Sequence, residues 1–373
     1  MVLAFLREHQ SQIVADLGEF GQRESPSTDK ALLDDFSQFL AAYAARCGGR
    51  SEVLAMQDTG THVRIRWGPD EGEPILLVGH FDTVWPEGTL QRMPFRTTDG
   101  VATGPGVFDM KAGLVHGFWA IRALREVAGV DRPIEFFCNG DEEVGSPTSQ
   151  PLIETAARGK RAVFILEPSY DGALKTARKG VGIFHAEIKG RPAHAGLDPF
   201  AGASAIEELA HLISALHALS NRETGTTVNV GIVSGGTRSN VVAEQASADI
   251  DLRVTTQVEA ERMTQVILQQ HAHHPDVQVK MTGGINRPPM ERTARTEELF
   301  HQARRLAREL GIDDLQEAMV GGASDGNFCA ILGIPVLDGL GAVGGGAHAV
   351  TEHVNVADMP VRAALVARLL ETA

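Results

Sequence analysis

Short apolar runs alternate with helical patterns over much of this chain. The clearest runs cover residues 75–78, 134–138 and 162–166. A run of this length without alternation is typical of a strand buried on both faces of a parallel sheet. Between the first two runs, residues 111–127 carry apolar side chains at the spacing of a buried helix. The pattern therefore predicts an α/β fold with helices flanking a sheet.

The two ends of the chain continue this pattern. Residues 2–21 and 27–46 have apolar positions at helical spacing and are predicted to form covering helices, with Ser27 or Thr28 as a cap of the second. Further elements follow the same rules. They are a strand over 61–67, a helix over 297–310, a strand over 334–337 and a closing helix from Pro360.

The middle of the chain has a different order of elements. It predicts, in sequence, a strand over 182–188, a helix over 203–219, strands over 226–233 and 240–254, a helix over 258–271 and a strand over 277–281. The order βαββαβ is that of a ferredoxin-like unit, which folds on its own core. We therefore expect residues 181–286 to be an inserted domain, and residues 1–180 with 287–373 to form the domain into which it is inserted.

Composition restricts the classes of function. The 373 residues carry 34 basic and 48 acidic side chains, a formal charge of −14, which disfavours nucleic acid and anionic membranes as partners. No segment approaches the length of a membrane span, and residues 1–6 are too short for a signal peptide, so a cytoplasmic protein is expected. Cys47, Cys138 and Cys329 are odd in number and far apart, which argues against a disulfide framework or a CxxC zinc site.

Polar side chains follow the predicted strands or glycine-rich loops at several points of the chain. They comprise two histidines and five acids: His80, Asp82, Asp109, Glu142, Glu143, Glu167 and His348. Ligands of open α/β sheets gather beyond the carboxyl ends of the strands. So many carboxylates at one edge would repel one another unless cations lay among them. Mixed nitrogen and oxygen ligands favour zinc, with manganese or cobalt as substitutes.

Six motifs along the chain occur in an order that resembles a known family. They are Gly-His-Phe-Asp-Thr-Val at 79–84, Gly-Pro-Gly-Val-Phe-Asp-Met-Lys-Ala-Gly at 104–113, Gly-Asp-Glu-Glu-Val-Gly-Ser at 140–146, Leu-Glu-Pro at 166–168, Pro-Ala-His-Ala-Gly at 192–196 and Gly-Gly-Ala-His at 345–348. This succession resembles the zinc aminoacylase and glutamate carboxypeptidase family of co-catalytic metallopeptidases, closest to its bacterial glutamate carboxypeptidase branch. The resemblance implies a zinc-exopeptidase-like mixed sheet and an inserted dimerisation or lid domain.

The resemblance also implies a metal site. Carried over residue by residue, it implies two zinc ions bridged by Asp109, one completed by His80 and Glu167 and the other by Glu143 and His348. Two metals about 3.5–4 Å apart need a carboxylate that offers one oxygen to each, which agrees with a bridging aspartate.

Two acids beside the implied ligands have other roles. Glu142 matches the family's general base, which takes a proton from the attacking water and returns it to the leaving nitrogen. Asp82 would orient His80 through its second ring nitrogen. The family commonly has a cis peptide bond after the bridging aspartate, which here is Asp109–Met110.

Residues outside the cluster are expected to contact the substrate. The resemblance suggests that His194 reaches the active site of a partner subunit and stabilises the oxyanion there, which needs a homodimer through the inserted domain. It also suggests that Asn240 and Arg253 bind a free carboxylate of the substrate. An alternative for Arg253 is a surface ion pair with a neighbouring acid, and for His194 an ordinary loop histidine. Weaker candidates, near the domain junctions, are Arg287, Lys175 and Arg178. Ser324 and Asp325 lie near the substrate in the family or else cap the next helix.

These expectations combine into one hypothesis of function. It is a dizinc hydrolase that cleaves the amide bond to a C-terminal amino acid, with folate-like or N-acyl amino acid substrates. The alternatives are an N-acyl-amino-acid deacylase or a dipeptidase, and more remotely a non-catalytic binding protein of the same fold. A binding protein has no need of a non-ligand acid beside Glu143, so Glu142 favours an enzyme.

Overall fold

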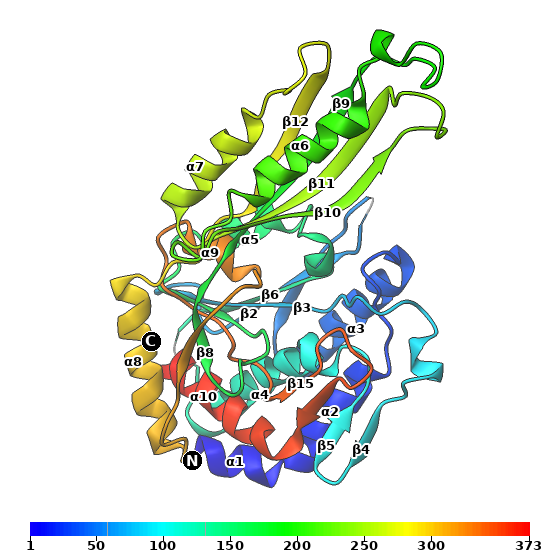
Figure 1. Cartoon of the computed structure of the whole chain (residues 1–373). Coiled ribbons are helices and arrows are strands. Elements are labelled where there is room, and N and C mark those ends of the chain that lie inside the picture. Colours follow the sequence, from blue (N-terminus) through cyan, green and yellow to red (C-terminus); the bar gives the residue numbers. More distant parts are fainter. Residues whose placement is uncertain (58, 131) are drawn as a thin grey trace. The chain divides into compact units, whose positions relative to one another are not determined.

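The apolar runs of the sequence form the centre of a six-stranded mixed sheet in the computed structural model, which describes residues 1–57, 59–130 and 132–373 (Figure 1). The strand order is β1-β2-β6-β3-β7-β14. The bounds are Arg50–Leu54 for β1, His62–Trp67 for β2, Ile75–His80 for β3, Ile134–Asn139 for β6, Ala162–Ile165 for β7 and Val336–Leu337 for β14. Strands β6, β3, β7 and β14 are parallel, whereas β1 and β2 run antiparallel to their neighbours.

The register of the parallel strands places their carboxyl ends at one edge of the sheet. Ile75, which begins β3, pairs with Ile134 of β6 and with Ala162 of β7, so the three strands end at the same edge of the sheet. Every residue of these three strands is buried, as expected for short apolar runs, and in β6 this includes Glu135 and Asn139. The predicted α/β architecture with a mixed sheet flanked by helices is confirmed.

Helices from both ends of the chain cover this sheet. Their bounds are Val2–Glu8 for α1, Gln10–Gly21 for α2, Lys30–Arg46 for α3, Ala112–Val127 for α4, Gln150–Ala157 for α5, Ala294–Glu309 for α8, Gly326–Ala330 for α9 and Met359–Thr372 for α10. The single helix predicted over 2–21 is wrong, because the chain breaks at His9. The predicted cap is also wrong, since the side chain of Asp29 accepts from Leu32 N at 3.1 Å.

Short elements complete this part of the fold. A small sheet has the order β15-β16-β5-β4, and β8 pairs with β13. Their bounds are Arg96–Thr98 for β4, Val101–Thr103 for β5, Leu174–Arg178 for β8, Glu317–Val320 for β13, Gly344–Gly345 for β15 and His353–Asn355 for β16. Single turns of 3₁₀ helix are η1 Thr89–Gln91, η3 Glu142–Val144, η4 Pro199–Ala201 and η5 Val356–Asp358, and η2 Val107–Lys111 is a π-helical turn.

Contacts divide the chain into two units. The first comprises residues 1–177, 292–319 and 324–373, and the second comprises residues 178–291 and 320–323. Among the described residues, no helix is both long enough and apolar enough to cross a membrane.

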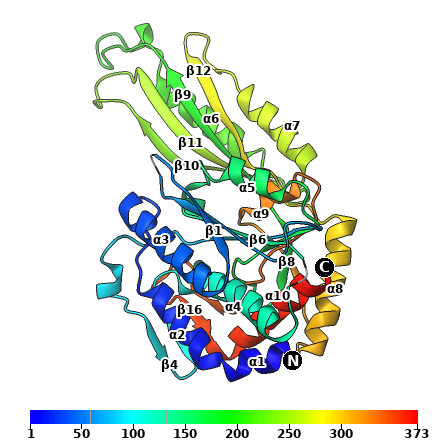
Figure 2. The same ribbon diagram turned by 180° about the vertical axis from the view of Figure 1, so that it is seen from behind.

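The second unit has the predicted order βαββαβ. Its elements are Gly180–Lys189 for β9, Ala205–His217 for α6, Thr227–Gly235 for β10, Gln245–Val254 for β11, Gln257–Leu268 for α7 and Gln278–Arg287 for β12. The four strands form a sheet in the order β10-β11-β9-β12, and both helices lie on one face of it (Figures 1 and 2). Alternate residues of β9, such as Phe184 and Ile188, are buried in the unit's own core, while Ile183 is 56% exposed.

One buried histidine of α4 lacks polar partners. His116 is fully buried, and neither of its ring nitrogens has a hydrogen-bond partner among the described residues. Burial, together with the nearby Arg362, lowers the pKa of His116 to about 3. The folded protein therefore holds this imidazole neutral, whereas the unfolded chain protonates it near its usual pKa.

We expect His116→Leu to make the protein less sensitive to acid. Because the folded pKa is depressed, the wild-type protein loses stability as the pH falls from about 6.5 toward about 3, and leucine removes that loss. The variant should gain about 2 kcal/mol relative to wild type between pH 7.5 and pH 5. Urea unfolding at the two pH values measures this difference. The exposed His301→Leu is the control, and an equal change in both variants would contradict the assignment.

Candidate metal centre

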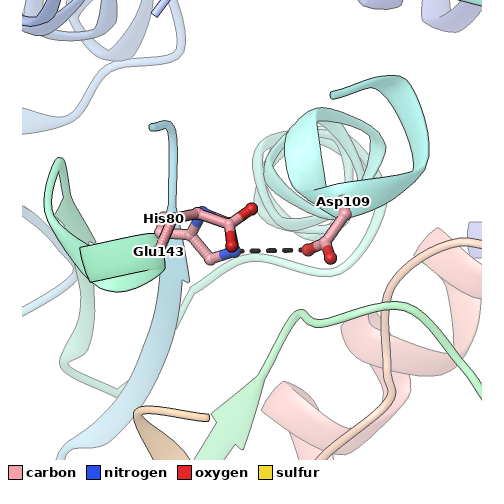
Figure 3. Close-up of side chains that lie close together, drawn as sticks. All are labelled: His80, Asp109 and Glu143. Atoms are coloured by element: carbon pink, nitrogen blue, oxygen red, sulfur yellow. Dashed lines mark ion pairs between the residues drawn. The ribbon is translucent and has the colours of Figure 1, made fainter. Parts of the chain in front are cut away.

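His80 stands at the carboxyl end of the central strand. Its side chain is 2% exposed, and its Nδ1 lies 3.0 Å from the carbonyl oxygen and 3.4 Å from the carboxylate of Asp82. The other nitrogen, Nε2, lies 3.3 Å from Asp109 Oδ1 and 3.4 Å from Glu167 Oε1. The ring is thus fixed on one side and faces two acids on the other. Figure 3 shows the imidazole turned toward Asp109.

Asp109 lies in the π-helical turn η2, between β5 and α4. The peptide bond Asp109–Met110 is cis, as the resemblance led us to expect. The turn follows Gly104 and Gly106, whose φ angles of 152° and 71° are open to glycine but costly for other residues. The side chain of Asp109 reaches back to His80 at the end of β3.

The two oxygens of Asp109 face different partners. Oδ1 lies toward His80, and Oδ2 lies 3.4 Å from Nε2 of His348. His348 Nε2 is also 3.2 Å from Glu143 Oε1. The contacts therefore form two groups that share Asp109, one with His80 and Glu167 and one with Glu143 and His348.

Glu142 and Glu143 lie on η3, the turn that follows β6. Their backbone N–H groups each donate to the carboxylate of Asp82 at 3.1 Å, and Ser27 Oγ donates to the same group at 2.8 Å. Ligand atoms of His80, Glu142 and Glu167 lie within 4.8 Å of one another, as do those of His80, Asp109 and Glu143. The adjacent acids thus reach the same small volume.

Charge in the cluster strongly favours cations. Burial acts to lower the pKa of His80, but contacts with the carboxylates of Asp109, Asp82 and Glu167 raise it well above its usual value. Contacts with Asp109 and Glu143 raise the pKa of His348 to about 10. Burial acts to raise the pKa of Asp109, yet the two histidines hold it well below its usual range. Both imidazoles would be protonated among these acids, so positive charge is what the site attracts.

The residues present fit a pair of divalent ions. Asp109 Oδ1 is buried and has no hydrogen-bond partner among the described residues, because the His80 contact at 3.3 Å lacks hydrogen-bond geometry. A buried carboxylate oxygen without a donor calls for a cation. The set of imidazole and carboxylate groups suits zinc or a similar ion.

Three predicted substrate residues lie in the second unit. His194 is exposed, and its Nδ1 accepts from Gly196 N and Leu197 N at 3.1 Å each. The next residue, Ala195, donates its N–H to the carbonyl of Asn240 at 3.0 Å, so the two loops lie side by side. Arg253 forms a two-pronged pair with Asp251, at 2.8 and 2.9 Å, which is the ion pair considered as its alternative role.

The three weaker basic candidates are largely buried. Arg178 is 3% exposed and donates to the carbonyls of Gly322 and Ala323 at 3.1 and 3.3 Å. Arg287 is 7% exposed and lies in the second unit, whereas Lys175 is 9% exposed and lies in β8 of the first unit.

Two buried acids support the site: Glu352, which was not predicted, and Asp325, which was expected near the substrate or as a helix cap. Glu352 accepts four hydrogen bonds, including one from Asp109 N. Asp325 does not cap α9 with its side chain but accepts from Ser146 Oγ at 2.6 Å and Asn139 Nδ2 at 2.9 Å, at both ends of the turn that carries Glu142. The sequence clue to Glu352 was an acid close to the Gly-Gly-Ala-His motif.

A sheet edge that gathers two imidazoles and several carboxylates around one shared aspartate is characteristic of metal-dependent hydrolases. The sequence comparison makes the class specific. The pattern of Peptidase family M20/M25/M40 matches residues 76–372, and the chain belongs to this family of metal-dependent peptidases. The remote alternative of a non-catalytic binding protein is therefore set aside.

Characterised relatives differ in what they act on. Carboxypeptidase G2 of Pseudomonas sp. (strain RS-16) is 28% identical over 305 residues, which cover 80% of this chain and 74% of that protein. Succinyl-diaminopimelate desuccinylase of Acinetobacter baylyi is 29% identical over 362 residues, which cover 90% and 93% of the two chains. The family thus gives a metal-dependent hydrolase without giving the substrate.

Solved structures agree with the fold. A tripeptidase from Staphylococcus aureus superposes with a TM-score of 0.81 at 22% identity, covering 97% of this chain and 98% of that one. An M20 family metallo-carboxypeptidase from Sulfolobus solfataricus gives a TM-score of 0.76 at 16% identity, with 96% and 98% covered. Both units of the present chain therefore have counterparts in known structures.

Proposed function

We propose that this protein is a dizinc carboxypeptidase of the glutamate type, which hydrolyses the amide bond to a C-terminal amino acid of a small substrate. The observation that carries the proposal is the orientation of Asp109, whose two oxygens face two different pairs of histidine and acid. A carboxylate so placed can serve two ions at once. Family membership supports the hydrolytic chemistry.

The proposed ligands follow the two groups of contacts. His80, Asp109 and Glu167 would hold one ion, and Asp109, Glu143 and His348 the other. When bound, two divalent ions supply Lewis acidity, which favours ionisation of water and polarises a carbonyl oxygen. Asp82 would keep the Nε2 of His80 directed at its ion, because its own oxygens lie at Nδ1.

Glu142 is the proposed general base. Its backbone is fixed by Asp82, and its carboxylate reaches the neighbourhood of His80 and Glu167. In the proposed reaction the Glu142 carboxylate takes a proton from the attacking water and later gives it to the leaving amide nitrogen, so one group serves both steps.

The proposed substrate contacts come from the family resemblance. Asn240 and Arg253 would bind the free carboxylate of the substrate, and His194 would donate to the oxyanion that forms at the carbonyl. Arg253 would exchange its bond with Asp251 for one with the substrate. Arg287, Lys175 and Arg178 remain weaker proposals for the same role, because their polar atoms are mostly buried.

A homodimer through the second unit is also proposed. Strand β10 is at the edge of its sheet, pairing with β11 only, and it exposes Ile232 and Val233 by 64% and 54%. An edge strand with exposed apolar residues favours pairing with another chain. Sedimentation at the mass of two chains would support it. A cytoplasmic location is proposed as well.

A second candidate function is deacylation of N-acyl amino acids, or cleavage of dipeptides. The desuccinylase of Acinetobacter baylyi, aligned over 93% of its own length, favours the first of these. The two functions differ from the leading one in the group on the acyl side of the cleaved bond, rather than in the metal chemistry.

A panel of amides with a free carboxylate tests the proposal. We expect N-acylated glutamate and aspartate, including a folate-like aryl-acyl glutamate, to give kcat/KM at least about tenfold above alanine or leucine analogues, as one charge-assisted hydrogen bond can provide. Chelation should abolish hydrolysis, and zinc should restore it.

The same panel separates the alternatives. Dipeptides with a free amino group should be poor substrates, and a preference for them would indicate a dipeptidase. Succinyl or acetyl amides hydrolysed regardless of the amino acid would indicate a deacylase. Hydrolysis that survives complete removal of metal would contradict all three.

A further inference from the structure

Glu352 ties together two segments that carry proposed metal ligands. It lies four residues after His348 and directly before β16, and its side chain is fully buried. Strand β16 pairs with β5, with His353 opposite Thr103, and β5 leads into the turn that bears Asp109. The pairing of β16 with β5 holds the segment that carries His348 next to the segment that carries Asp109. The two segments separate at Glu352, just beyond the paired residues.

The carboxylate of Glu352 accepts four hydrogen bonds. Its Oε1 accepts from the backbone N–H groups of Phe108 and Asp109 at 2.9 and 3.0 Å. Its Oε2 accepts from Gly106 N at 2.9 Å and from the indole N–H of Trp85 at 2.8 Å. Both oxygens are therefore fully used, three of the four bonds going to the turn that presents Asp109.

These bonds are ones that the turn needs. Residues 106–110 form an irregular turn in which Asp109 and Met110 depart from helical angles, so the N–H groups of this turn have few acceptors of their own. A buried N–H without an acceptor costs roughly 1–3 kcal/mol. A charged acceptor at the end of a rigid strand pair satisfies several such groups at once and fixes the backbone of Asp109.

The two halves of the cluster are supported differently. His80 is held in the central sheet, between β6 and β7, and Asp82 lies at its Nδ1. His348 lies outside the strands, with φ of 60° and a side chain 51% exposed. It lies in the loop between the paired strands β15 and β16, and Glu352 at the end of this loop bonds to the turn that bears Asp109.

We propose that Glu352 is a positioning residue that sets the spacing of Asp109 and His348 and thereby the affinity for the ion held by Asp109, Glu143 and His348. This inference rests on the proposed two-metal centre. The ion held by His80, Asp109 and Glu167 should depend on Glu352 less, because two of its three ligands, His80 and Glu167, lie at the ends of strands of the central sheet.

Replacement of Glu352 by glutamine tests the proposal. Glutamine has the same shape, but one of the two carboxylate oxygens becomes an NH₂ group. Each oxygen of Glu352 accepts from two N–H groups, so whichever way the amide is turned its NH₂ meets two donors, and the turn must shift. We expect the weaker of two zinc-binding steps to lose about 10- to 100-fold in affinity, with the tighter step changed little. Zinc is titrated into the chelated full-length chain against a chromophoric chelator, and bound metal is counted after gel filtration.

Two further variants make the result specific. Trp85→Phe removes one donor to Oε2 but leaves both bonds to Oε1, so both zinc ions should stay bound with nearly wild-type affinity. Glu352→Asp keeps the charge at a shorter reach and should weaken the second step with a thermal midpoint close to wild type. Circular dichroism shows whether each variant is folded. If Glu352→Gln does not fold, the zinc affinity of Glu352→Asp tests the proposal instead.

Each outcome has one meaning. If Glu352→Gln binds two zinc ions as tightly as wild type, the positioning role is wrong. The role is also wrong if a folded Glu352→Asp binds like wild type while Glu352→Gln unfolds, or if both steps weaken equally. If the wild-type chain itself binds fewer than two zinc ions, the proposed two-metal centre fails instead.

Discussion

Replacing Glu142 by glutamine is expected to lower kcat for amide hydrolysis by about 10²- to 10⁴-fold while leaving two metal ions bound. Glutamine has the same size and can still accept hydrogen bonds, but it cannot take up the proton of the attacking water. The backbone N–H of residue 142 still donates to Asp82, so the turn should keep its shape. Steady-state kinetics on the best amide of the panel, together with metal content, measures both quantities.

The Glu142 result has a clear control and a clear contradiction. Glu126→Gln makes the same chemical change at an exposed position of α4 and should leave kcat unchanged. A Glu142→Gln enzyme that loses a metal ion would show that Glu142 is a ligand, and one that hydrolyses at the wild-type rate would show that another group moves the proton.

Asp109→Asn should remove both metal ions and with them hydrolysis. The amide offers one acceptor oxygen in place of two, so it cannot serve both groups of ligands. It also removes a negative charge from between His80 and His348, which weakens the attraction of the site for two cations. We expect less than one zinc ion per chain after gel filtration, and a loss of activity at least as large as that of Glu142→Gln.

A matched variant separates this effect from a general loss of charge. Asp35→Asn alters an exposed aspartate of α3 in the same unit and should keep two zinc ions. If Asp109→Asn retained two ions with nearly wild-type affinity, the shared aspartate would not be the bridge, and the two ions would need separate ligand sets.

Much of the fold could be predicted from local pattern. Buried strands such as β3 and β6 are short and mostly apolar runs, and α4 has apolar residues at helical spacing, so the sequence pattern agrees with the observed burial. Strand β1 was missed because it is an exposed edge strand with the sequence Arg-Ser-Glu-Val-Leu, which has no clear alternation. The break at His9 was missed because apolar residues continue at helical spacing across it.

Residues of the candidate site could be predicted where they stand at the end of a buried strand, because ligands gather at that edge of an α/β sheet. His80 and Glu167 follow buried strands, and a resemblance between motifs supplied Asp109 and His348. The supporting contacts were not predictable, because side chains bond to backbone groups far away in sequence. Glu352 reaches Asp109 N across 243 residues, and Asp82 reaches Glu142 N across 60, with no local pattern to mark either.

The position of Asp82 limits how independently the parts of the centre can vary. One carboxylate lies beside the ring of His80 and also accepts from the backbone of Glu142 and Glu143. A shift of this single group would displace an imidazole and two acids together. Metal affinity and proton transfer are therefore properties that mutations at this point change in concert, and effects measured at Asp82 and Glu142 should be non-additive.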